Sequence, residues 1–120
     1  MNPVHHSINY IEFPSTDLAS TKKFYGDVFG WEFQDWGETY ISFSGAEVSG
    51  GFELNPEGRS PSRQGALVVL YSKDLVATEK AIVAAGGKVV IEAFDFPGGR
   101  RFQFTDPNGN ELAVWTEPAK

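Results

Sequence analysis

Few side chains in this chain could do chemistry, and their spacing limits what they could do together. His5 and His6 are the only histidines, and there is no cysteine. Along an extended strand His6 lies about 13 Å from Tyr10 and about 20 Å from Glu12, whereas all ligands of a metal ion must reach one point at about 2 Å. The sequence therefore predicts no metal site shared by these residues, and no Ser-His-Asp arrangement can be built.

Acid–base chemistry is the alternative that the remaining side chains allow. Tyr10 and Glu12 are two positions apart, so they share one face of a strand, and Glu111 is a third candidate for proton transfer. Glu12 could act as a general base or could form an ion pair with Arg101. Two oxygen donors on one strand would be an incomplete metal site.

A pair of glycines, Gly98 and Gly99, precedes Arg100 and could offer backbone amides to an anion. The full phosphate-loop pattern is absent, so the pair can equally make only a turn. Asp106 begins the sequence Asp-Pro-Asn-Gly, which is typical of a turn between two strands.

These side chains must be positioned by strands and two helices. Residues 6–13 alternate between polar and apolar types, and residues 66–71 are continuously apolar, which predicts two strands, the second one more buried. Asp17 and Asp74 follow these strands at positions suited to cap a helix N-terminus. Gly30 is suited to end the first helix in the left-handed conformation.

Short strands separated by turn residues follow each predicted helix. We expect them at residues 31–33, 40–44 and 48–54 in the first half and at residues 88–92, 101–105 and 111–115 in the second.

The two halves repeat each other with an offset of 57 positions. Residues 11–33 align with residues 68–90, which places Asp17 on Asp74 and Gly30 on Gly87. A unit of roughly 60 residues is marginal alone, so the repeat favours two βαβββ modules that share one core.

We therefore expect a single α+β domain over residues 1–120, with the two modules forming an open, cupped, mixed or antiparallel sheet and the helices on its outer face. The first module would be residues 1–54 and the second residues 66–120. Residues 55–65, rich in proline and glycine, would be the linker.

Composition excludes several classes of function. Ten Lys and Arg against sixteen Asp and Glu give a net charge of −6, and no basic stripe suits a phosphate backbone, so we expect no nucleic-acid partner. There is no signal peptide or apolar run that could span a membrane, so we expect a cytoplasmic protein with no membrane partner.

The motifs together resemble the vicinal oxygen chelate superfamily, which includes glyoxalase I, extradiol dioxygenases and bleomycin-binding proteins. The resemblance is carried by the duplicated βαβββ pattern, by PSTDLASTKKFYGDVFGWEF and by DPNGNELAVW. It covers nearly the whole chain and implies paired modules around a cup that holds a ligand, often in a homodimer.

The resemblance also implies where a divalent metal would be held. Counting from the shared motifs, the ligand positions fall on Tyr10, Leu67, Ala113 and either Gly51 or Phe52. Carbon-only side chains cannot donate to a cation, and a neutral phenol is a poor ligand for a first-row divalent ion. We therefore expect no metal cofactor.

If Tyr10 faces the cup, strand alternation assigns the remaining lining. Arg101 and Gln103 oppose Phe102 and Phe104, and Trp115 shares a face with Glu111. The predicted ligand-binding residues are Tyr10, Glu12, Phe52, Leu67, Arg101, Gln103, Glu111, Ala113 and Trp115.

An aromatic hollow with a few polar groups suits a small organic molecule. The main prediction is a glyoxalase- or bleomycin-resistance-like protein that binds such a molecule without the usual metal. The alternatives are a lyase, isomerase or dioxygenase of the same superfamily that acts on a small organic substrate, and a degenerate module with an interaction or regulatory role. Catalytic residues stay unassigned.

Overall fold

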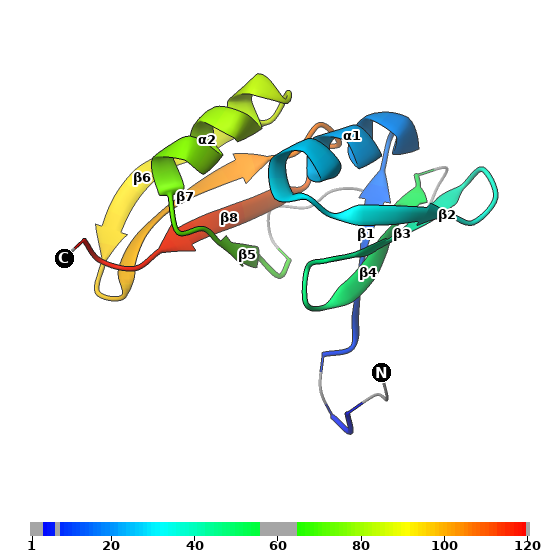
Figure 1. Ribbon diagram of the computed structural model, residues 1–120, viewed down its shortest axis with the longest axis horizontal. Helices are drawn as coiled ribbons and strands as arrows, with labels where there is room; N and C mark the ends of the chain where they lie inside the picture. Colours follow the sequence, from blue (N-terminus) through cyan, green and yellow to red (C-terminus); the bar gives the residue numbers. More distant parts are fainter. Residues whose placement is uncertain (1–3, 7, 56–64, 120) are drawn as a thin grey trace. The chain divides into compact units, whose positions relative to one another are not determined.

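The computed structural model describes residues 4–6, 8–55 and 65–119, and the chain divides into two compact units at residues 60 and 61. Most of the expected linker, residues 55–65, lies outside the described residues. The order of elements is βαβββ in each unit, as the repeat predicts (Figure 1). Each unit is an α+β module with one helix and a four-stranded mixed sheet.

The first unit has the strand order β1-β4-β3-β2. Its elements are β1 (Tyr10–Ser15), α1 (Leu18–Phe29), β2 (Glu32–Asp35), β3 (Tyr40–Ser44) and β4 (Ser49–Leu54). Strand β1 runs parallel to β4, and the other two pairs are antiparallel.

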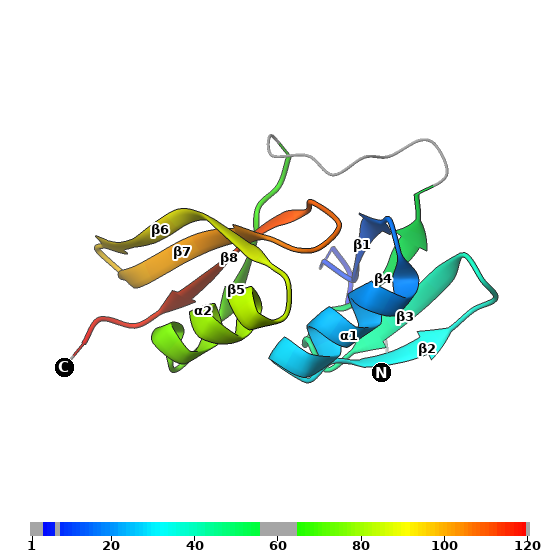
Figure 2. The same cartoon turned by 90° about the horizontal axis from the view of Figure 1, so that it is seen from above.

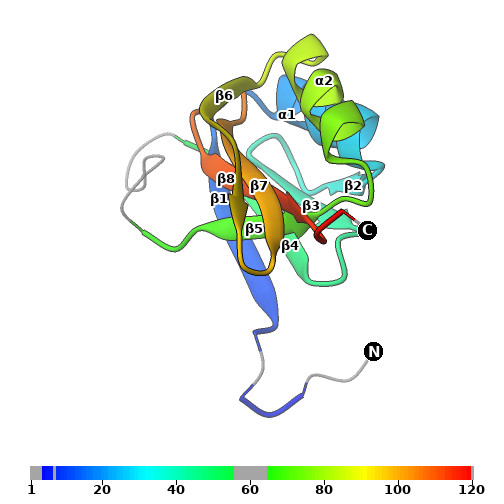
Figure 3. The same cartoon turned by 90° about the vertical axis from the view of Figure 1, so that its left-hand side faces the viewer.

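The second unit repeats this topology with the order β5-β8-β7-β6. Its elements are β5 (Val68–Tyr71), α2 (Leu75–Ala84), β6 (Lys88–Phe96), β7 (Gly99–Thr105) and β8 (Glu111–Thr116). Strand β5 runs parallel to β8, and α2 packs along one face of the sheet (Figures 2 and 3). Among the described residues of this unit, residues 65–119, no helix covers the opposite face of the sheet.

The join between strand and helix is built in the same way in both units. In the first, the Asp17 carboxylate accepts hydrogen bonds from the amides of Ala19 (3.0 Å) and Ser20 (3.3 Å), which satisfies donors that a helix N-terminus leaves unpaired. The Ser15 hydroxyl accepts from the Asp17 amide and lies 2.9 Å from the Thr21 hydroxyl. We name this arrangement the Ser-Asp-Thr joint.

In the second unit the joint consists of Ser72, Asp74 and Thr78. The two hydroxyls lie 2.7 Å apart, Ser72 accepts from the Asp74 amide at 3.0 Å, and Asp74 accepts from the Ala77 amide at 3.1 Å. The predicted helix caps are therefore confirmed. Gly30 also ends α1 in the left-handed conformation, with φ of 74°.

The core of the first unit is mostly aromatic. Tyr25 of α1 is fully buried, and its ring stacks on Trp31 with centroids 4.7 Å apart and lies 5.1 Å from Phe52. Phe13 stacks on Phe52 at 5.2 Å. Rings of this size dominate core energetics because each buries a large area.

The core of the second unit is built from fewer rings and more aliphatic groups. Its fully buried side chains are Ile82, Phe102, Phe104, Leu112, Ala113 and Val114. The Asp-Pro-Asn-Gly turn before β8 is confirmed, because the buried Asp106 carboxylate accepts from the amides of Asn108 (2.9 Å) and Asn110 (2.8 Å).

Three expectations about the strands are corrected. The first strand begins at Tyr10, not at residue 6. The apolar strand β5 is not more buried than β1, because Val69 is 43% and Tyr71 50% exposed on the face that α2 does not cover. Strand β6 runs to Phe96, past the expected end at residue 92, and its pairing with β7 is interrupted by register shifts.

Among the described residues, no helix is long and apolar enough to cross a membrane.

Candidate functional site

The open face of the second sheet, opposite α2, brings together most of the residues that alternation assigned to a ligand. In β8, Leu112 and Val114 are fully buried, whereas Glu111 and Trp115 point to the other face. Strand register places Arg101 beside Trp115 and Gln103 beside Ala113. The five predicted lining residues of β7 and β8, namely Arg101, Gln103, Glu111, Ala113 and Trp115, therefore share one face.

A hydrogen-bonded chain of polar side chains crosses this face. Arg101 donates from Nη2 to Gln103 Oε1 at 3.2 Å, and Gln103 donates from Nε2 to Glu111 Oε2 at 2.6 Å. Gln103 is only 8% exposed, so its amide orientation is fixed by these two contacts. These two hydrogen bonds connect the Arg101 cation to the Glu111 carboxylate through the neutral amide of Gln103.

The guanidinium of Arg101 rests on an aromatic ring. Its Cζ lies 5.4 Å from the ring centroid of Phe94, which pairs with Arg101 in the β6–β7 ladder. This distance is within the range of a cation–π interaction. The Nε atom is buried and has no hydrogen-bond partner, and no described carboxylate of its own unit forms an ion pair with Arg101.

Apolar side chains surround this polar chain. Those on the open face that remain more than a third exposed are Leu67, Val69, Tyr71, Ile91 and Phe94. Several exposed apolar side chains around a few hydrogen-bonded polar side chains are typical of a ligand-binding surface.

Tyr71 connects this face to the last strand. Its ring packs edge-on against Trp115, with centroids 5.2 Å apart, and its hydroxyl donates to Glu117 Oε2 at 2.6 Å. This hydrogen bond raises the pKa of Tyr71 and lowers the pKa of Glu117, because it holds the phenol proton against a carboxylate.

The open face of the first sheet carries a second polar group, the Tyr10–Tyr40–Glu12 cluster. The hydroxyls of Tyr10 and Tyr40 lie 2.5 Å apart, and Tyr40 donates to Glu12 Oε1 at 3.0 Å. Burial, and then the hydrogen bonds to Tyr10 and Glu12, raise the pKa of Tyr40 well above its usual value near 10. Tyr40 is therefore a neutral donor at physiological pH.

Gly51 makes room for this cluster. A Cβ atom added at Gly51 would lie 2.3 Å from the Tyr40 hydroxyl and 2.7 Å from the carbonyl oxygen of Ile41. Gly51 pairs with Glu12 in the ladder between β1 and β4, so its missing side chain leaves the space in which Tyr40 reaches Glu12.

Sequence reasoning misassigned one lining residue and missed others. Phe52 was expected on the open face, but it is fully buried on the helix-covered face, because its parallel neighbour Phe13 points there and Tyr25 of α1 packs on it. Tyr40 was missed, although its alternation with the buried Ile41 could have indicated its direction.

Phe94 was missed because β6 was expected to end before it. The expected ion pair between Glu12 and Arg101 would join residues of different units, and it stays a prediction. The Gly98–Gly99 pair serves the β6–β7 hairpin: a Cβ at Gly99, where φ is +151°, would lie 2.0 Å from the carbonyl oxygen of Thr116.

The residues at the metal positions that the resemblance implies do not fit a metal. The Tyr10 hydroxyl is already hydrogen-bonded to that of Tyr40, and Leu67 and Ala113 have no donor atom. At the fourth position Gly51 has no side chain and Phe52 has only carbon atoms. Among the described residues, no three His, Cys, Asp or Glu side chains gather in a way that could hold an ion. The donor set is thus unlike the nitrogen, sulfur and carboxylate sets that bind divalent metals.

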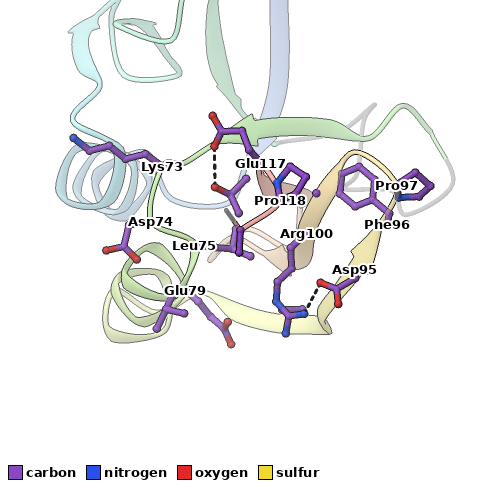
Figure 4. A pocket seen from close by; sticks show the side chains of 15 residues that line it. Lys73, Asp74, Leu75, Glu79, Asp95, Phe96, Pro97, Arg100, Glu117 and Pro118 are labelled. Atoms are coloured by element: carbon purple, nitrogen blue, oxygen red, sulfur yellow. Dashed lines mark hydrogen bonds and ion pairs between the residues drawn. The ribbon is translucent and has the colours of Figure 1, made fainter.

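A hollow of about 780 Å³ lies elsewhere in the second unit, on the helix side of the sheet (Figure 4). The start of α2, the β6–β7 hairpin and residues 116–119 line it. Its charged groups include Arg100, which pairs with Asp95 at 2.8 Å, and Asp74, which caps α2. Because these groups have partners within the fold, we place the candidate site on the open face.

Comparison with known proteins defines the family. The family model of the Glyoxalase/Bleomycin resistance protein/Dioxygenase superfamily matches residues 7–114. A glyoxylase-like domain-containing protein of Didymella fabae is 33% identical over 126 aligned residues, 98% of each chain. CFP32 of Mycobacterium bovis is 30% identical over 89% of this chain but only 44% of CFP32, so this chain spans less than half of that protein.

A solved structure gives the same fold. A glyoxalase/bleomycin resistance protein/dioxygenase family enzyme from Burkholderia phytofirmans superimposes with a TM-score of 0.78 over 92% of this chain and 98% of that one, at 13% identity. The chain belongs to the Glyoxalase/Bleomycin resistance protein/Dioxygenase superfamily.

Proposed function

We propose that this chain binds a small organic molecule on the open face of its second sheet and does so without a resident metal. The observation that carries the proposal is the exposed apolar surface of β5, of Leu67 before it and of β6, which lies around the partly buried, hydrogen-bonded side chains of Arg101, Gln103 and Glu111. Apolar area supplies binding free energy, while a few fixed polar groups orient the ligand.

The donor chemistry at the family's metal positions supports a metal-independent role. Leu67 and Ala113 occupy two of these positions and have no donor atom, and Leu67 is exposed enough to contact a hydrocarbon surface. Homodimer formation and a cytoplasmic location belong to the same proposal, and sedimentation and cell fractionation test them.

A thermal-shift screen tests the proposal. Aromatic metabolites, thiol adducts and glycopeptide antibiotics would be added with and without divalent metals. We expect organic compounds to raise Tm without metal, because a ligand at 100 times its Kd stabilises the folded state by about 2.7 kcal/mol. Stabilisation by a metal alone would contradict the proposal, and no response to any compound would favour an interaction module.

Two tryptophan variants locate the site. Trp115→Ala removes the ring that packs against Tyr71 on the open face and should abolish the ligand-induced rise in Tm. Trp36→Ala is the matched control, because Trp36 is 56% exposed in the first unit and contacts Ser42 there. Equal loss in both variants, or no loss in Trp115→Ala, would move the site away from this face.

A second candidate function is acid–base catalysis at the Tyr10–Tyr40–Glu12 cluster. The Tyr40 hydroxyl donates a hydrogen bond to the Glu12 carboxylate, and the Tyr10 hydroxyl is hydrogen-bonded to that of Tyr40. As Tyr10 takes a proton from a substrate, its own proton can pass to Tyr40 and the proton of Tyr40 to Glu12. A lyase or isomerase that removes a proton from a small substrate would need such a group. Glu12→Gln should then abolish turnover while leaving ligand-induced stabilisation intact.

A further inference from the structure

We propose that Arg101 is the anchor for the carboxylate of an aromatic organic acid on the open face of the second sheet. The inference rests on the proposed function, because it names the chemical class of the ligand that this face would bind. Three properties of the residues around Arg101 carry it: an incomplete charge balance, a fixed orientation of the guanidinium, and an apolar surface beside it.

The charge of Arg101 is not balanced within its unit. Its Nε is buried without a hydrogen-bond partner, and no described carboxylate of the second unit forms an ion pair with it. A partly buried guanidinium that lacks a counter-ion is costly. The neighbouring Arg100 differs, because it pairs with Asp95 at 2.8 Å. Arg100 thus has a carboxylate partner in the described part of the unit, whereas Arg101 has none there.

The guanidinium is oriented before any ligand arrives. The guanidinium lies over the Phe94 ring, with Cζ 5.4 Å from the ring centroid, and its Nη2 donates a hydrogen bond to Gln103 Oε1. Gln103 is in turn held by Glu111 at 2.6 Å. A guanidinium has five N–H donors. Among the described residues of this unit one Nη2 donor is used, and the Nε donor is buried, so the outer donors on Nη1 and Nη2 are left for a ligand. The remaining planar donors match the two oxygens of a carboxylate.

The surface beside Arg101 determines the rest of the ligand. Phe94 and Trp115 flank Arg101 in the strand register, and Ile91 pairs with the neighbouring Gln103, so a hydrocarbon body attached to the carboxylate would contact apolar side chains. The carboxylates of Glu111 and Glu117 also lie on this part of the unit and would repel a second negative charge. These features fit a monocarboxylate with a flat apolar body.

Titration of the full chain with two matched probes tests the inference. 2-Naphthoate carries the carboxylate, and 2-naphthamide has the same body without the charge. We expect the wild type to bind 2-naphthoate about 10- to 100-fold more tightly than 2-naphthamide by isothermal titration, which is the range of a charge-assisted hydrogen bond. Added salt should weaken only the naphthoate complex.

Two arginine variants provide the matched comparison. Arg101→Gln should weaken 2-naphthoate binding about 10- to 100-fold, leave 2-naphthamide unchanged and keep the wild-type Tm or raise it, because it removes an unpaired charge. Arg100→Gln removes the adjacent guanidinium on the opposite face and should leave both affinities unchanged. Arg101→Lys keeps the charge but loses the planar fork, so an intermediate affinity is expected.

The results distinguish failure of the role of Arg101 from failure of small-molecule binding as such. Equal affinity of the wild type for both probes would overturn the role of Arg101 and leave small-molecule binding standing. No binding of either probe to the wild type would overturn both for aromatic ligands. If 2-naphthoate binds Glu12→Gln but not the wild type, then Glu12 is the partner of Arg101 and the inference fails.

Discussion

Replacing Gly51 with alanine tests how the first sheet forms its polar cluster. The new methyl group would lie 2.3 Å from the Tyr40 hydroxyl, 2.6 Å from its Cζ and 2.7 Å from the carbonyl oxygen of Ile41. All three distances are shorter than real Cβ contacts, and one of the obstacles is backbone. The phenol of Tyr40 must therefore move away from Glu12 and Tyr10.

The magnitude follows from two contributions. Overpacking against the ring and the strand costs about 1–3 kcal/mol. Loss of the hydrogen bonds from Tyr40 to Glu12 and to Tyr10 costs about 1 kcal/mol each. We expect Gly51→Ala to lower the free energy of unfolding by about 3–5 kcal/mol, a large part of the 5–15 kcal/mol that typical domains have.

Urea unfolding at pH 7, followed by circular dichroism and tryptophan fluorescence, measures this loss. Gly65→Ala is the control, because a Cβ there meets nothing within 4 Å and its φ is not positive. It should change the free energy of unfolding by less than about 0.5 kcal/mol.

Making Gly51→Ala in a Tyr40→Ala variant shows whether the Tyr40 ring is what opposes the new methyl group. In Tyr40→Ala, the ring is gone and only the Ile41 carbonyl opposes the new methyl group, so Gly51→Ala should cost clearly less than in the wild type. If Gly51→Ala costs the same in both backgrounds, or costs no more than Gly65→Ala in the wild type, then Tyr40 does not lie over Gly51 and the cluster is wrong.

Three further predictions concern titration and helix capping. The folded state raises the pKa of Tyr40, so stability is fully present below pH 10 and falls as pH rises further; in urea unfolding at pH 8 and 10.5, Tyr40→Phe should show a smaller fall. The pKa of Glu117 is lowered by Tyr71, so this contribution is lost as pH falls below about 4.5, and Tyr71→Phe should return the NMR-measured pKa of Glu117 toward its usual value. Asp17→Ala should cost about 1 kcal/mol in thermal unfolding and more than Asp74→Ala, because Asp17 accepts from two amides and Asp74 from one; equal losses would contradict this.

Features set by local chemistry could be predicted from the sequence. The caps at Asp17 and Asp74, the left-handed Gly30 and the Asp106 turn each depend on a few neighbouring residues. The alternation in β8 was also readable, because Leu112 and Val114 leave only one face for Trp115.

Features set by distant pairing could not be predicted in the same way. Strand β4 has two adjacent glycines, so its sequence shows no alternation, and only its pairing with Phe13 determines that Phe52 faces the helix. The register shifts in β6 break the two-residue period, which hid Phe94. The apolar sequence of β5 indicated burial, yet Val69 is exposed because one helix covers only one face of the sheet.

The Ser-Asp-Thr joint shows how far the two halves have diverged. Ser15 and Thr21 are fully buried, whereas Ser72 and Thr78 are only partly buried, yet both pairs keep the same hydrogen bonds. The Ser–Asp and Ser–Thr hydrogen bonds that join strand to helix are thus the same in both units, while the side chains on the two open faces differ.

One open face now presents phenols and a carboxylate, and the other presents a guanidinium among hydrocarbon groups. The same βαβββ topology thus carries two chemically different surfaces, one in each unit.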